Sequence, residues 1–307
     1  MFDWLDPYSQ LVAVGILINA ILVLSLFVVF QCGVLSLATI GFMADGAYTA
    51  SLLTTKQHWP PALAILAGAL LAGALGYAFG RLVLHLRGIY LALGTFALGQ
   101  VCILGIANIS FTGGDQGIVG IPVIVTLGEM ILVVLVIGVV LQVIHVSFIG
   151  RALRAIRLDE RVAAGVGIDV GRYRALAFAS SGVLAGLAGG LQAFETGVIS
   201  PGQYSFTLLV QMLALAMIAG SYWWAGSLIT AVVIGIVQQY IGTTNAVAEG
   251  LLYGGLLIVV MMVAPNGITD PRLLRRLIPG HLRRRRDVDP SPILKPDPLG
   301  SAPVTVE

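Results

Sequence analysis

The sequence contains few charged residues. Asp, Glu, Lys and Arg make up 10% of its 307 residues, against about 25% in ordinary soluble proteins. Hydrophobic residues make up 58% before the 38 glycines are counted. A soluble domain of this length could not hide so much apolar surface from water. The composition therefore excludes an ordinary cytosolic enzyme, a nucleic-acid-binding protein and a disordered chain, and favours a membrane protein.

Cysteine and histidine are also scarce. The two cysteines, Cys32 and Cys102, lie inside apolar runs, which favours small buried side chains over a disulfide framework. The four histidines are scattered without ligand spacing, so we expect no metal or haem site. Neither a Gly-x-Ser-x-Gly nor a His-Glu-x-x-His motif occurs, which argues against an intramembrane enzyme. We expect no catalytic residues and no cofactor in this chain.

Long stretches of the sequence carry no charge. They are residues 7–44, 57–80, 88–114 and 196–248. A helix needs about 20 apolar residues to cross the hydrocarbon core, and these stretches lack the alternation of barrel strands. We predict an all-α, polytopic membrane protein with about nine transmembrane helices, of which one or two, the second and the seventh, are broken. The predicted spans are residues 11–30, 33–53, 62–83, 89–109, 128–146, 176–194, 208–223, 227–241 and 250–264.

The basic residues are unevenly distributed between the predicted loops. With nine spans and a cytoplasmic C-terminus, 16 of the 17 basic residues fall on the cytoplasmic side, and only Lys56 lies outside. Because basic loops stay in the cytoplasm, we expect the N-terminus outside and the C-terminus inside. The N-terminal residues are acidic, with Asp3 and Asp6, and lack the basic region of a cleavable signal peptide.

The sequence divides into a transmembrane domain, residues 1–268, and a tail, residues 269–307. The tail is basic and Pro-rich, and we expect it to be cytoplasmic and largely disordered. Its four consecutive arginines, Arg283 to Arg286, suit an anchor on anionic lipid headgroups. A specific protein contact is the alternative.

The longest charged loop, residues 150–174, has the pattern of a short amphipathic helix. Arg154, Arg157 and Arg161 fall on one face at helical spacing. Residues 163–165 end this helix, and Gly167 permits a turn. The helix is either an interfacial anchor or a docking helix for a cytoplasmic partner. Its other face carries Leu153, Ile156 and Ala164.

Small residues recur four positions apart inside two predicted spans. Such spacing is typical of helices whose backbones approach closely, and hinges are the alternative reading. The residues are Gly182, Gly186 and Gly190 in one span, and Gly68, Ala72, Gly76 and Gly80 in the other.

Several segments in a fixed order resemble the LivM-like permease subunits of bacterial ABC importers of the branched-chain amino-acid type. The stretch LRGIYLALGT at 86–95, the Gly-rich TGGDQGIVGIP at 112–122 and LAGLAGGL at 184–191 all resemble family segments. The segments at 33–53 and 253–268, and the loop at 150–174, resemble the family's second span, last span and coupling loop. The resemblance covers residues 11–268.

The resemblance implies a protein of the bacterial inner membrane that passes solutes rather than transforming them. The chain lacks the Gly-x-x-x-x-Gly-Lys-Ser/Thr loop that binds ATP phosphates, so ATP would be hydrolysed by partner subunits. The implied partners are a second homologous permease, two cytoplasmic ATPase subunits, an external solute-binding protein and membrane lipid, with no nucleic acid. The coupling residues implied are Arg151, Arg154, Arg157, Glu160, Arg161, Gly165 and Gly167.

The sequence also departs from the family pattern. Asp45 and Glu195 stand where the family has apolar or small residues, and Trp223 and Trp224 interrupt a glycine turn. These departures bear on the solute, which the family varies from branched-chain and other amino acids to urea and short amides.

Asp45 allows two main readings. It either caps a half-helix in a span broken at Gly41 and Gly46, or faces the translocation path and contacts an ammonium or amide group. A salt bridge to a partner subunit is a third possibility. An alternative function, an ion-coupled secondary transporter of small polar solutes, would also use intramembrane acids. The candidates for the translocation path are Asp45, Thr95, Gln100 and Gln192.

Overall fold

The computed structural model describes residues 6–86, 88–220, 223–241 and 255. The predicted ninth span, residues 250–264, and the tail, residues 269–307, lie outside this part of the chain, apart from Gly255. The arginines at 283–286 lie outside it too.

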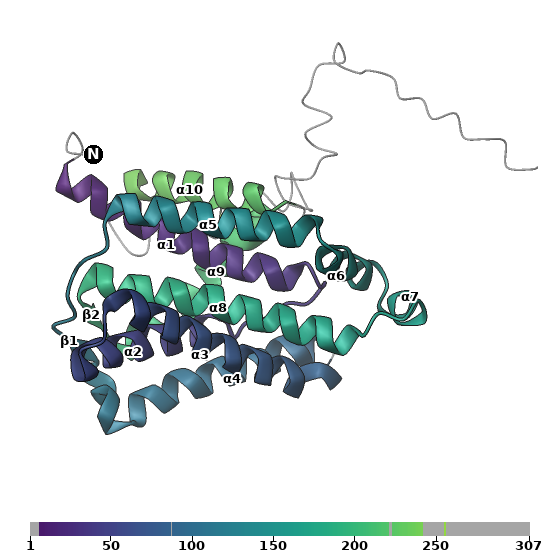
Figure 1. Ribbon diagram of the computed structural model, residues 1–307, viewed down its shortest axis with the longest axis horizontal. Coiled ribbons are helices and arrows are strands. Elements are labelled where there is room, and N and C mark those ends of the chain that lie inside the picture. The colour runs from purple at the N-terminus through teal and green to yellow at the C-terminus, as the bar shows by residue number, and fades with distance from the viewer. Residues whose placement is uncertain (1–5, 87, 221–222, 242–254, 256–307) are drawn as a thin grey trace, which may run out of the picture.

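The described chain is a bundle of helices with one very small sheet (Figure 1). Strands β1 (Ile118–Val119) and β2 (Val198–Ile199) pair antiparallel, with Ile118 opposite Ile199. Four short 3-10 helices lie in the connections: η1 (Val83–His85), η2 (Ser110–Thr112), η3 (Gly114–Gln116) and η4 (Pro201–Gln203). The α-helices are α1 (Pro7–Phe30), α2 (Thr39–Gln57), α3 (Pro61–Leu82), α4 (Ile89–Asn108), α5 (Leu127–Val146), α6 (Phe148–Leu158), α7 (Glu160–Gly165), α8 (Val170–Thr196), α9 (Phe206–Ala219) and α10 (Trp224–Ile241).

Six helical stretches are long and apolar enough to cross a membrane, and the last of them runs from η4 through α9. They confirm a polytopic membrane protein. A shorter apolar helix covers Trp224–Val237 in α10. Helix α2 covers residues 39–53 of the second predicted span and continues to Gln57. The six stretches are Tyr8–Phe30, Pro61–Leu82, Ile89–Asn108, Leu127–Val146, Val170–Thr196 and Pro201–Ala219.

The prediction that Gly41 and Gly46 break the second span is wrong, because α2 is continuous through both. Their missing side chains let other helices approach instead. A Cβ on Gly41 would lie 2.7 Å from the Cα of Gly99, and one on Gly46 would overlap the backbone of Gly186. The non-helical part of this span is residues 33–38, before α2 begins at Thr39.

The seventh span also differs from the prediction. Helix α9 is continuous but ends at Ala219, whereas the predicted span reached residue 223. The next residue, Gly220, caps this end: it has a φ of +76° and donates its backbone N–H to the carbonyls of Ala216 and Met217.

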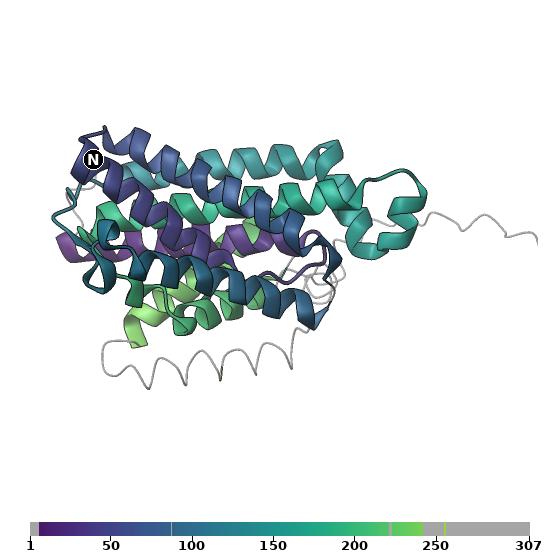
Figure 2. The same ribbon diagram turned by 90° about the horizontal axis from the view of Figure 1, so that it is seen from below.

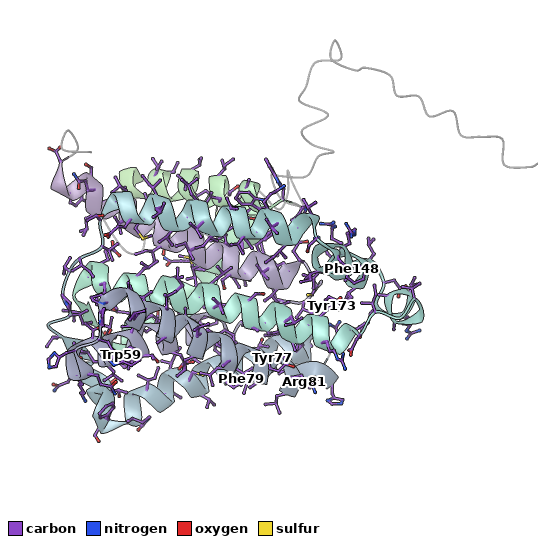
Figure 3. The ribbon with its side chains drawn as sticks, viewed as in Figure 1. Trp59, Tyr77, Phe79, Arg81, Phe148 and Tyr173 are labelled. Carbon is purple, nitrogen blue, oxygen red and sulfur yellow. The ribbon has the colours of Figure 1, made fainter. Side chains whose placement is uncertain are left out.

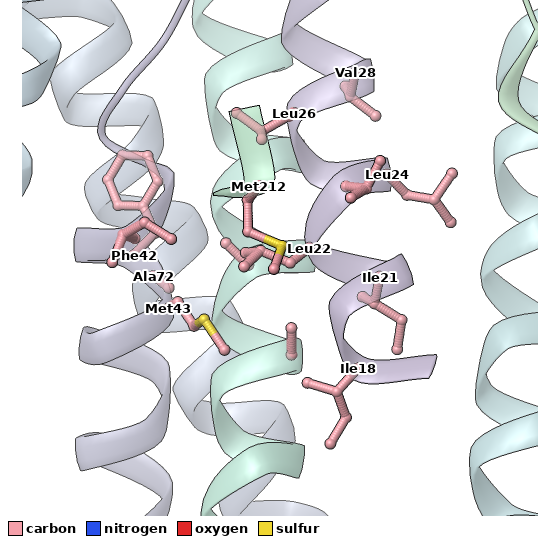
Figure 4. Close-up of a cluster of buried hydrophobic side chains, with 14 of the residues drawn as sticks. Ile18, Ile21, Leu22, Leu24, Leu26, Val28, Phe42, Met43, Ala72 and Met212 are labelled. Atoms are coloured by element: carbon pink, nitrogen blue, oxygen red, sulfur yellow. The ribbon is translucent and has the colours of Figure 1, made fainter. Parts of the chain in front are cut away.

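Helix α1 forms the centre of the core. Residues 20–24 of α1 are fully buried, so side chains all around the helix contact protein. Figure 2 shows α1 in the middle of the bundle. In Figure 4, Ile21 and Leu24 of α1 lie in the same cluster as Met43 of α2 and Met212 of α9.

Helices α2, α3 and α8 pack with their backbones almost in contact. A Cβ on Gly182 would overlap the carbonyl oxygen of Ala72, and one on Gly186 would lie 2.5 Å from the Cβ of Ala72. Helices α3 and α8 run without interruption through these small residues. The structure therefore shows close packing rather than hinges.

We predict that Gly46→Ala destabilises the protein. Alanine normally stabilises a helix relative to glycine by about 1 kcal/mol, but here its methyl group would overlap the Gly186 backbone. We expect a net loss of about 1–3 kcal/mol, seen as a lower melting temperature in detergent. Gly105→Ala in α4 is the control, because its Cβ would meet nothing within 4 Å. A Gly46→Ala protein as stable as the control would contradict the close approach.

Candidate functional site

The two ends of the bundle differ in charge. Seven of the described arginines lie at the end with α6 and α7, and these helices project beyond the neighbouring helix ends (Figures 1 and 2). Figure 3 labels Arg81 and Tyr173 at this end and Trp59 at the opposite end. Lys56 lies in the last turn of α2, three residues before Trp59. The seven arginines are Arg81, Arg151, Arg154, Arg157, Arg161, Arg172 and Arg174.

The loop forms two helices, so the prediction of one amphipathic helix is wrong. Asp159 has an extended backbone (φ −156°, ψ 114°) and separates α6 from α7. Its carboxylate accepts hydrogen bonds from the backbone N–H groups of Arg161 (2.8 Å) and Val162 (3.1 Å). Aspartate caps helix starts in this way, and here it begins a new helix. Arg161 therefore lies on α7, separate from Arg154 and Arg157 on α6.

Helix α6 is fixed to the bundle through its apolar face and through an arginine. Leu153 and Ile156 are buried, as the pattern predicts, whereas Ala164 on α7 is exposed. The Arg154 guanidinium donates to the backbone carbonyl of His145 (3.0 Å) at the end of α5 and contacts its ring nitrogens. These contacts make α6 part of the bundle's end rather than a free segment.

Two further contacts join these helices to their neighbours. A Cβ on Gly33, in the turn after α1, would lie 3.3 Å from the Cα of Arg157, so α6 packs directly over this turn. Glu160 of α7 forms a two-contact ion pair with Arg174 of α8, with N–O distances of 3.0 and 3.2 Å.

An apolar tip at this end has no partner among the described residues and was missed by the sequence reasoning. Leu158, Val162 and Val166 are 88%, 64% and 73% exposed. Their spacing of four was the available signal, but it runs across the break at Asp159. Gly165 beside them is exposed, and a Cβ there would meet nothing within 4 Å. An exposed apolar group beyond the ends of the membrane helices suits a protein contact.

Helix α7 ends as the sequence predicts, at Gly165, followed by a turn at Gly167. Gly167 has a φ of +85°. Its N–H donates to Ala164, and the N–H of Ile168 donates to Ala163, which together form a Schellman motif. Arg151, the remaining predicted coupling residue, is exposed on α6 and donates to the carbonyl of Val146.

The structure excludes one reading of Asp45. Asp45 lies inside α2 rather than at a helix start, so it is not a cap. It is 9% exposed and lies beside the Cys102 side chain of α4. Its Oδ2 atom is buried without a hydrogen-bond partner in the described structure. A buried acceptor of this kind suits a polar or cationic ligand.

The other predicted path residues lie on α4 and α8. Thr95 of α4 is fully buried and accepts the N–H of Leu37 (3.0 Å) in the segment 33–38. Thr95 therefore provides a hydrogen-bond acceptor for a backbone N–H group in the non-helical segment before α2. Gln100 is half-buried on α4, while Gln192 lies on α8 with a buried Oε1 that lacks a partner among the described residues.

Trp224, one of the departures from the family pattern, has a structural role, and two tyrosines form a pair that the sequence did not indicate. Trp224 packs on Gly138 of α5, and its indole N–H donates to Gln142 (2.6 Å), so Trp224 joins α10 to α5. Tyr48 and Tyr204 lie with ring centroids 6.5 Å apart, and their buried hydroxyls lack partners in the described region.

These features define a multi-pass membrane protein with a platform of two short helices, α6 and α7, at its arginine-rich end. The chain belongs to the family of permease components of branched-chain amino acid transport systems, whose model matches residues 9–263. Members of this family are permease components of ABC transport systems and are not enzymes. Membership of this family argues against the alternative function, an ion-coupled secondary transporter.

The chain is similar to proteins of both permease types. It is 29% identical over 285 residues to the high-affinity branched-chain amino acid transport system permease protein LivM of Escherichia coli, covering 80% of this chain and 67% of the relative. It is 31% identical over 182 residues to a probable branched-chain amino acid transport permease protein LivH of Methanocaldococcus jannaschii, covering 56% and 57%. No solved structure matches the chain.

We predict that Gly167→Ala loosens the end of α7. A left-handed backbone costs a residue with a Cβ about 1–2 kcal/mol. We expect faster hydrogen exchange and proteolysis at residues 162–168, with the rest of the bundle unchanged. Gly165→Ala is the matched control, because its φ is not positive and its Cβ has free space. Equal exchange in both variants would show that the turn does not depend on Gly167.

Proposed function

We propose that this chain forms, with a second homologous permease, the translocation path of an ABC importer. Two separate ATPase subunits drive it, and an external solute-binding protein delivers the solute. The platform formed by α6 and α7 is the observation that carries this proposal. Similarity to both LivM-type and LivH-type proteins supports a pair of related permeases.

The platform has the form of a docking site for a soluble subunit. It projects past the ends of the membrane helices and combines an apolar tip with arginines (Figure 1). Arg154, Arg157 and Glu160 hold it against α5, the turn after α1, and α8. A force on the platform therefore reaches several helix ends at once.

The same end faces the cytoplasm in our proposal. Seven arginines lie there, whereas Lys56 is the basic residue described at the other end. This distribution follows the positive-inside rule and puts the N-terminus outside, in a bacterial inner membrane. Since ATPase subunits are cytoplasmic, their docking on α7 would establish the same orientation.

The solutes we propose are branched-chain or related amino acids, with urea and short amides as the wider class. The family supports the first group. Asp45 supports a solute that carries an ammonium or amide group, because its carboxylate has an unpaired oxygen inside the bundle.

We predict that Gly165→Leu prevents ATPase docking without unfolding the chain. The open space around Gly165 accommodates the side chain within the protein, but a docked subunit would meet it. We expect pull-down of the ATPase subunits to fall about tenfold or more. Gly128→Leu is the control, since Gly128 is equally open but lies at the opposite end of α5. Normal pull-down and uptake in Gly165→Leu would leave α6 and α7 as an interfacial anchor only.

We predict that Asp45→Asn reduces uptake of an amino acid by about tenfold or more while the complex still assembles. The change keeps the side-chain shape but removes the charge that would attract an ammonium group. Uptake in proteoliposomes is compared with the amount of assembled complex. The control is Glu129→Gln, which removes an exposed carboxylate whose capping role with Thr126 an amide can keep. Equal losses of uptake and assembly, or no loss, would remove Asp45 from the path.

A further inference from the structure

The link between α7 and the bundle is a well-formed ion pair. The Arg174 guanidinium donates through Nη1 to Oε1 and through Nη2 to Oε2 of Glu160, at 3.2 and 3.0 Å. The side chains are only 14% and 33% exposed. Two parallel hydrogen bonds from a planar guanidinium fix orientation as well as distance. Such a pair resists both separation and rotation of α7 relative to α8.

A second ion pair in the same segment provides a natural contrast. Arg172 and Asp169 lie 2.8 Å apart, but their side chains are 76% and 53% exposed and both stand at the start of α8. Exposed pairs of this kind contribute little. This pair joins no two helices, so it transmits nothing from α7.

Helix α8 is the element best placed to carry a displacement into the membrane. It packs on α1, α2 and α3. Gly189 lies against the Met43 carbonyl and Gly186 against the Gly46 backbone of α2, without intervening side chains. Because such interfaces are close-packed, α8 cannot move along its axis without displacing α2, which carries Asp45.

We propose that Glu160 and Arg174 are a positioning pair that converts movement of the docked α7 into movement of α8, and through α8 of α2. This inference rests on the proposed function, since it assumes that ATPase subunits dock on α7. It assigns transmission to these two side chains and leaves binding of the ATPases to the exposed tip.

The test uses the complete complex in proteoliposomes and measures three quantities: ATPase-subunit pull-down, ATP hydrolysis and solute uptake. For Glu160→Gln we expect unchanged pull-down and continued hydrolysis, with solute moved per ATP reduced about tenfold or more. The exchanged pair, Glu160→Arg with Arg174→Glu, restores the contact with reversed polarity and is expected to recover most of the uptake. Arg172→Gln removes the exposed pair and is expected to behave as the unmodified protein.

Several outcomes would overturn the inference. Unchanged solute per ATP in Glu160→Gln would show that the pair transmits nothing. Loss of pull-down in that variant would make Glu160 a docking residue, and loss of folded complex would make it a structural one. If the exchanged pair does not fold, Arg174→Lys keeps the charge without the two-bond geometry, and full coupling there would also refute the proposal. Normal pull-down in Gly165→Leu would instead refute the proposed docking on α7.

Discussion

The close approach of α8 to α2 and α3 is the constraint on which the rest of the structure depends. Glycine at 46, 182 and 186 brings three backbones together, so side-chain bulk at these positions would separate the helices. In lipid, where apolar side chains gain little from contact with each other, this packing is the main source of helix association. The long helices can then hold α1, whose residues 20–24 are fully buried, at the centre.

This arrangement places α8 in contact both with α7 at the end of the bundle and with α2 inside the bundle. At one end it carries Arg174, which holds α7 through Glu160. Further along, it touches the part of α2 that carries Asp45. Helix α4 covers that carboxylate with Cys102, and Thr95 on the same helix secures the non-helical segment before α2. The platform and the buried acid therefore share one packed framework rather than two separate domains.

The interruptions of the helices show where pattern reasoning fails. Glycines at 41 and 46 suggested a break, yet a glycine in a membrane helix costs little when another backbone occupies the space of its side chain. No break was predicted at Asp159, although this residue divides the loop into two helices by capping the start of α7. The tertiary structure decides which group packs against a glycine or hydrogen-bonds to a backbone N–H. Sequence spacing alone therefore could not distinguish the glycines that leave α2 intact from the aspartate that separates α6 from α7.

The sequence by itself determined the membrane class, the approximate spans and the segregation of arginine to one end. These follow from local composition, because lipid tolerates few charges and requires long apolar helices. It also predicted the packing glycines. Only the tertiary structure decided that Arg161 leaves the face of Arg154 and Arg157, that Leu158, Val162 and Val166 form an exposed tip, and that Glu160 meets Arg174. Those relations join residues on different helices, and the angles between helices are set by packing rather than by sequence spacing.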